Sequence, residues 1–332
     1  MYSNDATDSL IESVTDALQY KKPLWLRGGN SKSFFGNPSD TDCTELDLRC
    51  HAGVIDYVPD ELVISVRAGT PLTEVVELLE QEGQMLPFEP PNFGGASTIG
   101  GVIASGLSGP RRPYTGAVRD FVLGVNLLSG NGSVLSFGGQ VMKNVAGYDV
   151  SRLVVGAMGT LGVIMDVSLK VLPKRSPEVT WRVSEVPASI GNLSAHAIVN
   201  GQHYIRVPEG ESLAGEVVDN DFWRQLATHE LSSLKEGDAL WRISVPPSSK
   251  QYLDEATVVE WGGALRWVAD PKAHPHEVLE SGHATLFRTT DDSERTRFQP
   301  LDPVVARIHE KLKHNFDPQE IFNPGRITWH AN

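Results

Sequence analysis

Arg27-Gly28-Gly29-Asn30-Ser31-Lys32-Ser33 is the stretch that decides the fold. It follows the short apolar run Leu24-Trp25-Leu26, which predicts a buried strand. Adjacent glycines after a strand let successive backbone N–H groups turn inward and form a nest that binds an anion. The asparagine and serines of the stretch add neutral donors, and its arginine and lysine add positive charge. An ordinary glycine turn is the alternative, because the stretch is neither a P-loop nor a G-x-G-x-x-G fingerprint.

A second glycine-rich stretch runs from Pro90 to Pro110 and has few charges before Arg111. Its glycine content predicts that it forms no stable helix. As a surface loop it would be unusually apolar, whereas a loop wrapped on a large, flat ligand explains both properties. A purely structural glycine loop is the alternative.

A third stretch contains Gly147, which predicts a loop ahead of a short helix from Asp149. Further on, the turn from Gly159 to Gly162 leads directly into an alternating strand that ends at Leu172. Backbone groups at such a turn can meet the edge of a nucleotide. The alternative is a plain helix–turn–strand connection.

A fourth stretch lies near the C-terminus. Pro303 begins a predicted helix with Val304, Ile308 and Leu312 on one face, and Asp317-Pro318 ends it. The segment that follows places Arg326 on a rigid turn, from which it reaches an anion. An exposed tail is the alternative.

Hydrophobic periodicity predicts further elements in the first half of the chain. They are a helix capped by Thr7 or Asp8 with Leu10, Val14 and Leu18 inward, a strand over 62–68, a helix with Thr70 as N-cap and Pro71 at N1 that stops at Gly83, and strands over 121–128 and 133–137 joined by the hairpin turn Gly130-Asn131-Gly132. This half is therefore mixed α and β. The prolines of Leu172–Pro177 favour a boundary there.

Composition excludes several classes of protein. The 332 residues suggest roughly two domains. With 29 basic against 42 acidic residues, the net charge of −13 disfavours binding to nucleic acid or anionic lipid. Two cysteines, Cys43 and Cys50, disfavour a secreted disulfide scaffold and are expected to be ordinary thiols. No signal peptide and no apolar run of about 20 residues is visible, which predicts a cytoplasmic protein without a membrane span.

Taken together, these motifs resemble FAD-linked oxidases with a p-cresol methylhydroxylase-type FAD-binding domain. The motifs also resemble the FAD-binding subunits of bacterial glycolate oxidase, and this resemblance covers nearly the whole chain. It implies an α+β fold: a two-part FAD-binding domain over 1–175, a reduced α+β cap domain over 176–300, and a C-terminal helix and tail over 301–332 that return to the FAD site. The motifs that carry it are Gly28–Gly36, Gly83–Pro87, Gly109–Pro113, Val118–Gly124, Phe137–Asp149, Trp241–Ser244, Trp261–Trp267 and Phe322–Arg326.

The resemblance also implies the residues that bind FAD. The loop after the first strand would hold the pyrophosphate, the second stretch would line the flavin and diphosphate, the third would face adenosine, and the fourth would return to the cofactor. No His or Cys lies between Arg27 and Gly36, so the FAD is expected to be non-covalent. The expected binding residues are Arg27, Gly28, Gly29, Asn30, Ser31, Lys32, Ser33, Thr98, Ile99, Gly100, Gly101, Ser105, Gly106, Gly159, Gly162, Val163, Ile164 and Arg326.

The chain departs from catalytic 2-hydroxy-acid dehydrogenases of this superfamily, which carry a His-x-Gly-Asp-Gly-Asn motif in a larger cap. Here the motif is absent, and the nearest candidate, His283, begins a predicted strand and is more typical of a structural residue. No catalytic base and no metal ligand is therefore assigned. A base is needed to take the hydroxyl proton while hydride leaves for the flavin.

Three hypotheses remain open. The first is an FAD-binding subunit that oxidises glycolate to glyoxylate together with a larger FAD-binding catalytic subunit and an iron–sulfur subunit, and meets the inner membrane only peripherally through these partners. The second is a self-sufficient small oxidase in which Arg111, Arg112 or Arg266 binds a carboxylate and His283 is the base. The third is a non-enzymatic interaction subunit. Two cysteines cannot hold a [4Fe–4S] cluster, which takes four, so electrons would leave through a partner.

Overall fold

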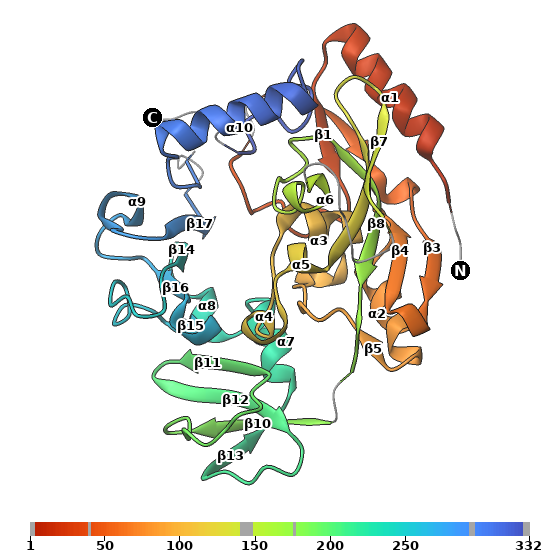
Figure 1. Cartoon of the computed structure of the whole chain (residues 1–332). Helices are drawn as coiled ribbons and strands as arrows, with labels where there is room; N and C mark the ends of the chain where they lie inside the picture. Colours follow the sequence, from red (N-terminus) through yellow and green to blue (C-terminus); the bar gives the residue numbers. More distant parts are fainter. Residues whose placement is uncertain (1–3, 39–40, 140–148, 175–176, 292–295, 328–332) are drawn as a thin grey trace.

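Two separate sheets organise the chain (Figure 1). The computed structural model describes residues 4–38, 41–139, 149–174, 177–291 and 296–327. One sheet has five strands in the order β3-β4-β8-β6-β7, and the other has eight in the order β13-β10-β12-β11-β15-β16-β14-β17. The chain passes from the first sheet to the second between β8 and β10. We call the part that carries the five-stranded sheet the first part, and the part that carries the eight-stranded sheet the cap.

The first part is built around the antiparallel five-stranded sheet. Its hydrophobic core gathers the inward face of the sheet and two helices, with Val66, Val75, Ile103 and Val167 almost fully buried. A parallel pair, β1 and β2, lies beside it. The strands are β1 (Leu24–Arg27), β2 (Thr44–Asp47), β3 (Val54–Val58), β4 (Val63–Arg67), β5 (Gln84–Met85), β6 (Val122–Leu128), β7 (Val134–Gly138), β8 (Val163–Lys170) and β9 (Leu172–Pro173), and the helices are α1 (Thr7–Tyr20), α2 (Leu72–Gln81), α3 (Ile99–Ser105), α4 (Arg112–Thr115), α5 (Val118–Phe121) and α6 (Val150–Leu153).

The prediction that the second glycine-rich stretch forms no helix is wrong. The seven residues of α3 are helical within it. The reason is packing against β4: a Cβ on Gly100 would lie 2.7 Å from Cβ of Ala68, so glycine lets the helix approach the strand. Burial of Val102 and Ile103 outweighs the poor intrinsic propensity of glycine.

The two predicted helix caps also differ from the structure. In α1, the carboxylate of Asp5 accepts hydrogen bonds from the backbone and hydroxyl of Thr7, which is the first helical residue. In α2, Pro71 is the N-cap. The buried Thr70 hydroxyl instead donates to the carbonyl of Arg67, 2.6 Å away, because the tight turn after β4 leaves that carbonyl within reach.

Other expectations agree with the structure. The hairpin turn Gly130-Asn131-Gly132 joins the antiparallel strands β6 and β7. Asp149 caps α6 by accepting from the backbone of Arg152. The predicted loop residue Gly147 lies outside the described residues. No helix in the described part of the chain is long and apolar enough to cross a bilayer.

The cap is the eight-stranded antiparallel sheet with three short helices. One face packs against the first part through Phe287, Trp267 and Trp261, which share a cluster with Phe35 and Met158. The opposite face of the sheet forms a separate hydrophobic cluster around Ile243 and Val268, which consists of cap residues alone. The strands are β10 (Glu178–Val183), β11 (Ala195–Val199), β12 (Gln202–Pro208), β13 (Gly215–Val218), β14 (Ala239–Ser244), β15 (Val258–Glu260), β16 (Leu265–Ala269) and β17 (His283–Thr289), and the helices are α7 (Asp221–Ala227), α8 (Ser232–Lys235) and α9 (Pro275–Val278).

Helix α10 (Pro303–Phe316) leads from the cap back to the first part, next to β1 (Figure 1). The face of α10 that carries the predicted aliphatic residues is largely exposed: Val304 and Ile308 are 55% and 53% exposed, and the buried positions are Ala306 and Lys313. The carboxylate of Asp317, just after the helix, accepts from the buried Lys313 ammonium at 2.6 Å. A buried ion pair rather than an aliphatic stripe therefore fixes the orientation of this helix.

Candidate cofactor site

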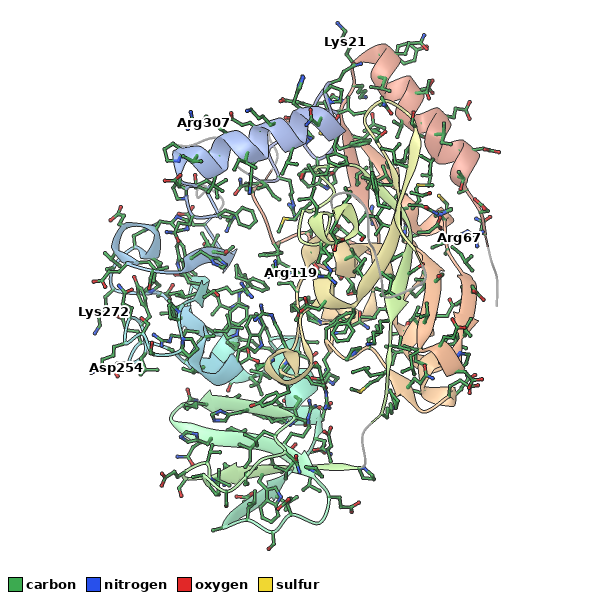
Figure 2. All side chains as sticks on the ribbon, in the orientation of Figure 1. Lys21, Arg67, Arg119, Asp254, Lys272 and Arg307 are labelled. Carbon is green, nitrogen blue, oxygen red and sulfur yellow. The ribbon has the colours of Figure 1, made fainter. Side chains whose placement is uncertain are left out.

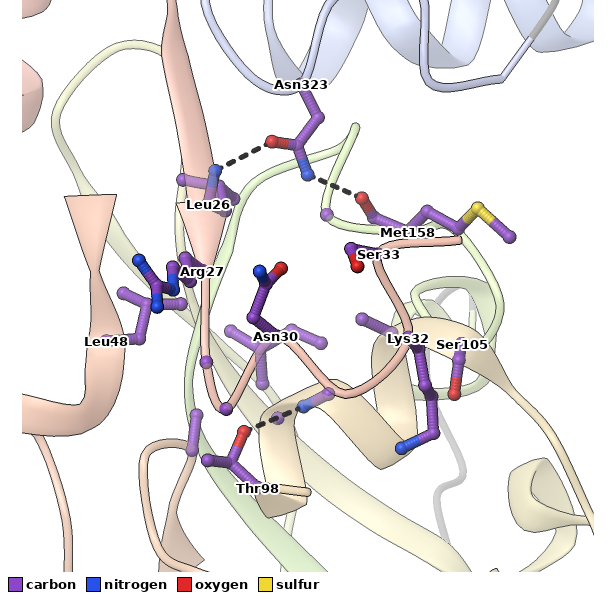
Figure 3. A pocket seen from close by; sticks show the side chains of 18 of the residues that line it. Leu26, Arg27, Asn30, Lys32, Ser33, Leu48, Thr98, Ser105, Met158 and Asn323 are labelled. Atoms are coloured by element: carbon purple, nitrogen blue, oxygen red, sulfur yellow. Dashed lines mark hydrogen bonds between the residues drawn. The ribbon is translucent and has the colours of Figure 1, made fainter. Parts of the chain in front are cut away.

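A cleft opens where β1 ends, between four segments that are far apart in the sequence (Figure 3). They are the loop after β1, helix α3, the turn before β8 and the segment after α10. The cleft is open to solvent, and about 880 Å³ of space within it and at its mouth is free of protein atoms. No aspartate or glutamate is among the described residues that line it, although the chain carries 42 acidic residues.

Most of the predicted FAD-binding residues meet in this cleft. Three do not line it: Ile99 is buried in the core behind it, Gly106 ends α3, and Val163 packs with the cluster around α1. The predicted residues that line the cleft are Arg27, Gly28, Gly29, Asn30, Ser31, Lys32, Ser33, Thr98, Gly100, Gly101, Ser105, Gly159, Gly162, Ile164 and Arg326.

The loop after β1 presents backbone donors to the cleft. No N–H group of residues 29–32 donates a hydrogen bond to any described residue. Asn30 adopts a left-handed conformation, with φ of 56°, and asparagine tolerates this better than most residues do. Unpaired N–H groups in a turn of this kind are the groups from which concave anion sites are built.

Glycine at 28 and 29 has a second role that the sequence did not reveal. A Cβ on Gly29 would lie 1.4 Å from the carbonyl oxygen of Ala96, and one on Gly28 would lie 2.3 Å from Oγ1 of Thr98. The loop therefore packs directly on the backbone that leads into α3. Glycine is needed for this internal contact, independently of any ligand.

The two cationic side chains of the loop, Arg27 and Lys32, differ in whether a carboxylate pairs with them. The guanidinium of Arg27 is paired with both carboxylate oxygens of Glu45, at 2.7 and 2.8 Å. The ammonium of Lys32 donates to the hydroxyl of Ser97 at 2.7 Å and has no carboxylate partner among the described residues. Burial lowers the pKa of Lys32 to about 8. Lys32 is thus the loop cation that is free to meet an anionic ligand.

Arg326 reaches the cleft as predicted, but its guanidinium bonds to protein. It donates to the carbonyls of Ser33 at 2.9 Å and of Lys32 and Asn37 at 3.3 Å, and also to the carbonyl of Phe35. Burial, with a contribution from the charge of Arg297, lowers its pKa to about 10. Because these carbonyls are turned toward Arg326, the loop is held in one conformation from the C-terminal segment.

Asn323 is a cleft residue that the sequence reading missed. Its side-chain oxygen accepts from the backbone of Leu26 at 2.7 Å, and its nitrogen donates to the carbonyl of Met158 at 2.7 Å (Figure 3). It therefore ties β1 to the turn before β8. The turn Asn323-Pro324-Gly325 was the available signal. The other lining residues not predicted are apolar: Trp25, Leu26, Phe35, Leu48, Ala68, Ala104 and Met158.

The arginines of the self-sufficient-oxidase hypothesis are separated by the fold. Arg111 is bound to Glu89 and Glu178 at the boundary between the first part and the cap, with contacts of 3.0 and 2.6 Å. Arg266 is fully buried on the opposite face of the cap sheet, where it donates to the carbonyls of Ser249 and Gln251. Only Arg112 remains available to a ligand.

The other candidate side chains stay isolated. His283 lies at the start of β17, where partial desolvation and the nearby charge of Arg242 lower its pKa. Cys43 and Cys50 are not joined in a disulfide, and neither is among the described residues that line the cleft. Among the residues that the structure describes, no group of three or more His, Cys, Asp or Glu side chains is placed to hold a metal ion.

Comparison with known proteins places this geometry in a family. Residues 5–138 match the FAD binding domain. The glycolate oxidase subunit GlcE of Escherichia coli K12 is 42% identical over 97% of both chains. The glycolate oxidase subunit GlcD of Bacillus subtilis is 31% identical over 52% of this chain and 37% of its own.

A solved structure shares the fold. Alkyldihydroxyacetonephosphate synthase superimposes with a TM-score of 0.64 at 13% identity, over 97% of this chain and 75% of that chain. At this identity the likeness concerns the fold alone. The fold, the FAD binding domain and the full-length similarity together show that the chain belongs to the family of the glycolate oxidase subunit GlcE.

Proposed function

We propose that this chain is the FAD-binding subunit of a multi-subunit glycolate oxidase, an FAD-dependent oxidoreductase that oxidises glycolate to glyoxylate. The observation that carries the proposal is the acid-free cleft. It presents unpaired backbone N–H groups and the free ammonium of Lys32 in a chain with a net charge of −13. These are the groups that a dianionic diphosphate requires.

The residues of the cleft fit FAD bound without a covalent link. The described lining residues include no histidine or cysteine that could attach to a flavin. The loop N–H groups of residues 29–32 and Lys32 would hold the diphosphate, and the backbone from Gly159 to Ile164 would face the adenosine. Arg326 would act on the loop rather than on the cofactor, since its donors are already used.

Each part of the chain has a separate role in the reaction. FAD supplies a two-electron acceptor for the hydride that leaves the hydroxyl-bearing carbon of the substrate. The chain binds and orients the cofactor and, through the aromatic cluster of Phe35, Trp267 and Phe287, excludes water where the first part meets the cap. No side chain is assigned as the base that takes the hydroxyl proton.

The division into an FAD-binding domain over 1–175, a cap over 176–300 and a C-terminal helix and tail over 301–332 belongs to this proposal. The change from the five-stranded to the eight-stranded sheet between β8 and β10 supports the first boundary. The partners we propose are a larger FAD-binding catalytic subunit and an iron–sulfur subunit. Two cysteines in the whole chain cannot supply the four thiolates of a [4Fe–4S] cluster, so electrons leave through a partner.

The test compares the isolated chain with the complex. Purified chain, supplemented with FAD and desalted, is expected to show flavin absorbance near 450 nm but to reduce its flavin only slowly with glycolate. Adding the copurified partner subunits should restore rapid turnover. Rapid turnover by the isolated chain would favour the self-sufficient oxidase, and a colourless protein would favour the interaction subunit.

A further inference from the structure

The face of the cap sheet that meets the first part carries a polar group in an otherwise apolar cluster. Arg242 on β14 is paired in register with Trp267 on β16 and with Thr285 on β17, so these three side chains share one face of the sheet. Trp261, just after β15, lies at the same boundary and donates from its indole N–H to the carbonyl of Gly109 at 3.2 Å. Side chains from both parts of the chain therefore meet here.

Two arginines stack on this one indole. The guanidinium carbon of Arg112, from α4 in the first part, lies 4.2 Å from the ring centroid of Trp261, and that of Arg242, from the cap, lies 5.2 Å away. Neither guanidinium makes a hydrogen bond or ion pair with a described residue. Arg111, Arg206, Arg266 and Arg288, on the elements around them, all have polar partners.

The nearest acidic side chains, Glu260 and Asp120, make no hydrogen bond or ion pair with either guanidinium among the described residues. Glu260 is buried and accepts from the indole N–H of Trp267 at 2.8 Å, and burial raises its pKa to about 7. Asp120, whose charge acts on Arg112, accepts from the backbone of Ala117. Burial and the like charge of Arg112 lower the pKa of Arg242 to about 10. Glu260 and Asp120 act on the two guanidiniums only through space, so an anion held directly between the guanidiniums would add a counter-charge bonded to both.

The pair lies close to the cleft in the first part. Ser105 lines the cleft, and only four residues further along the chain the carbonyl of Gly109 meets Trp261. Four residues span at most roughly 14 Å. A ligand held by the two arginines is therefore near the cofactor site, at the boundary where the cap covers it.

We propose that Arg112, Arg242 and Trp261 form a binding site for the carboxylate of a small 2-hydroxy acid, contributed by this subunit itself. Each guanidinium offers a planar fork of donors that matches a carboxylate, and the indole face fixes the orientation of both forks. In a chain with a net charge of −13, two adjacent arginines without a bonded carboxylate are a favourable place for an anion. The substrate class rests on the proposed function, whereas the anion site rests on the geometry alone.

The test is a calorimetric titration of the full chain, loaded with FAD, with oxalate as a carboxylate probe that cannot be oxidised by hydride loss. Wild type is expected to bind oxalate at one site. Arg112→Met and Arg242→Met should each weaken binding at least about tenfold. Arg242→Lys, which keeps the charge but not the fork, should fall between wild type and Arg242→Met. The matched control is Arg307→Met on α10, an exposed arginine far from the site (Figure 2), with no expected effect.

Each outcome decides the proposal. Unchanged oxalate affinity in both Met variants, or no binding by folded wild type, overturns the site. Binding of inorganic phosphate but not of oxalate overturns the carboxylate assignment. Flavin absorbance and melting temperature, measured on the same samples, separate these results from unfolding and from failure of the proposed function. A chain that binds oxalate at this pair but holds no FAD would refute the proposed function and leave the anion site standing.

Discussion

The cleft in the first part presents mainly backbone groups, whereas the cap face that meets the first part presents mainly side chains. The cleft uses backbone: unpaired N–H groups of residues 29–32, glycines that permit close packing, and no acidic lining residue among those described. The cap face uses side chains: the cation Arg242, the indoles of Trp261 and Trp267, and the carboxyl group of Glu260, with Arg112 reaching Trp261 from the first part. The first suits a fixed diphosphate, and the second suits a small ligand that must come and go.

The contrast teaches which kind of site can be read from a sequence. Backbone sites leave a local signature, because glycines must occupy consecutive positions, as at 28 and 29. Side-chain sites are assembled by the register of strands, and the pairing of Arg242 with Trp267 depends on residues 25 positions apart that no local pattern links. Four variants, taken from the largest expected effect to the smallest, test whether the two regions are independent.

Lys313→Met should have the largest effect, on both stability and the cleft. Its buried ammonium donates to Asp317 and to the carbonyls of Thr160 and Phe322, which adjoin the cleft residues Gly159 and Asn323. Removal leaves the carboxylate of Asp317 buried without its partner, which costs about 3–5 kcal/mol in free energy of unfolding. Denaturant unfolding and FAD content measure this, with the exposed Lys311→Met as the control on the same helix. An unchanged FAD content would contradict the expectation that the contacts of Lys313 support FAD binding in the cleft.

Arg111→Met tests a charged network at the boundary with the cap, as Lys313→Met tests one next to the cleft. It breaks a buried network in which Arg111 and Arg206 share Glu89 and Glu178. Because both carboxylates are partly exposed, the expected cost is about 2–3 kcal/mol, below that of a fully buried pair. FAD content of the folded fraction should be unaffected. The control is Arg119→Met, an exposed arginine nearby (Figure 2). Loss of FAD from the folded variant would show that the two regions are coupled.

Gly29→Ala should reduce FAD affinity with a smaller effect on folding. The added Cβ overlaps the carbonyl of Ala96, so the loop must move, and the N–H groups of residues 29–32 move with it. We expect FAD affinity to fall about a hundredfold, equivalent to roughly 2.7 kcal/mol. Gly191→Ala, where a Cβ meets nothing within 4 Å, is the control. Tight FAD binding by Gly29→Ala would contradict a backbone-built diphosphate site.

The smallest effect concerns pH. The Lys32 amine has a pKa of about 8 because it is buried, and a bound diphosphate favours its charged form. FAD binding should therefore take up a proton above pH 8, and affinity should fall as the pH rises past 8. Lys32→Met should lower affinity about tenfold at pH 7, roughly 1.4 kcal/mol, and flatten the profile. Lys272→Met, an exposed lysine on the cap (Figure 2), should leave both unchanged. An identical pH profile in Lys32→Met would exclude its ammonium from the site.

Much of the fold was predictable because hydrophobic alternation and glycine turns are local. Strands β6 and β7, on either side of the hairpin turn 130–132, and the alternating strand β8 follow directly from such patterns. Helix α3 was not predictable, since its glycines are stabilised by packing on Ala68. The orientation of α10 was missed because a lysine rather than its aliphatic residues faces inward.

The same division holds for the cleft. Its glycines and neutral donors were predicted from one stretch, and the residues that hold that stretch in place were not. Arg326 was expected to meet an anion, yet it binds carbonyls of the loop, because the distance to those carbonyls is set by the C-terminal segment and not by the local sequence. Asn323 acts in the same way, between β1 and the turn before β8.

The central claim is that the cleft recognises the diphosphate and adenosine half of FAD. The most direct measurement is an equilibrium titration of flavin-free chain with FAD and, separately, with FMN, which carries a single phosphate and no adenosine. The account predicts one tightly bound FAD per chain and FMN binding weaker by at least about a hundredfold. Equal affinity for the two flavins, or no binding of FAD by folded chain, would contradict it.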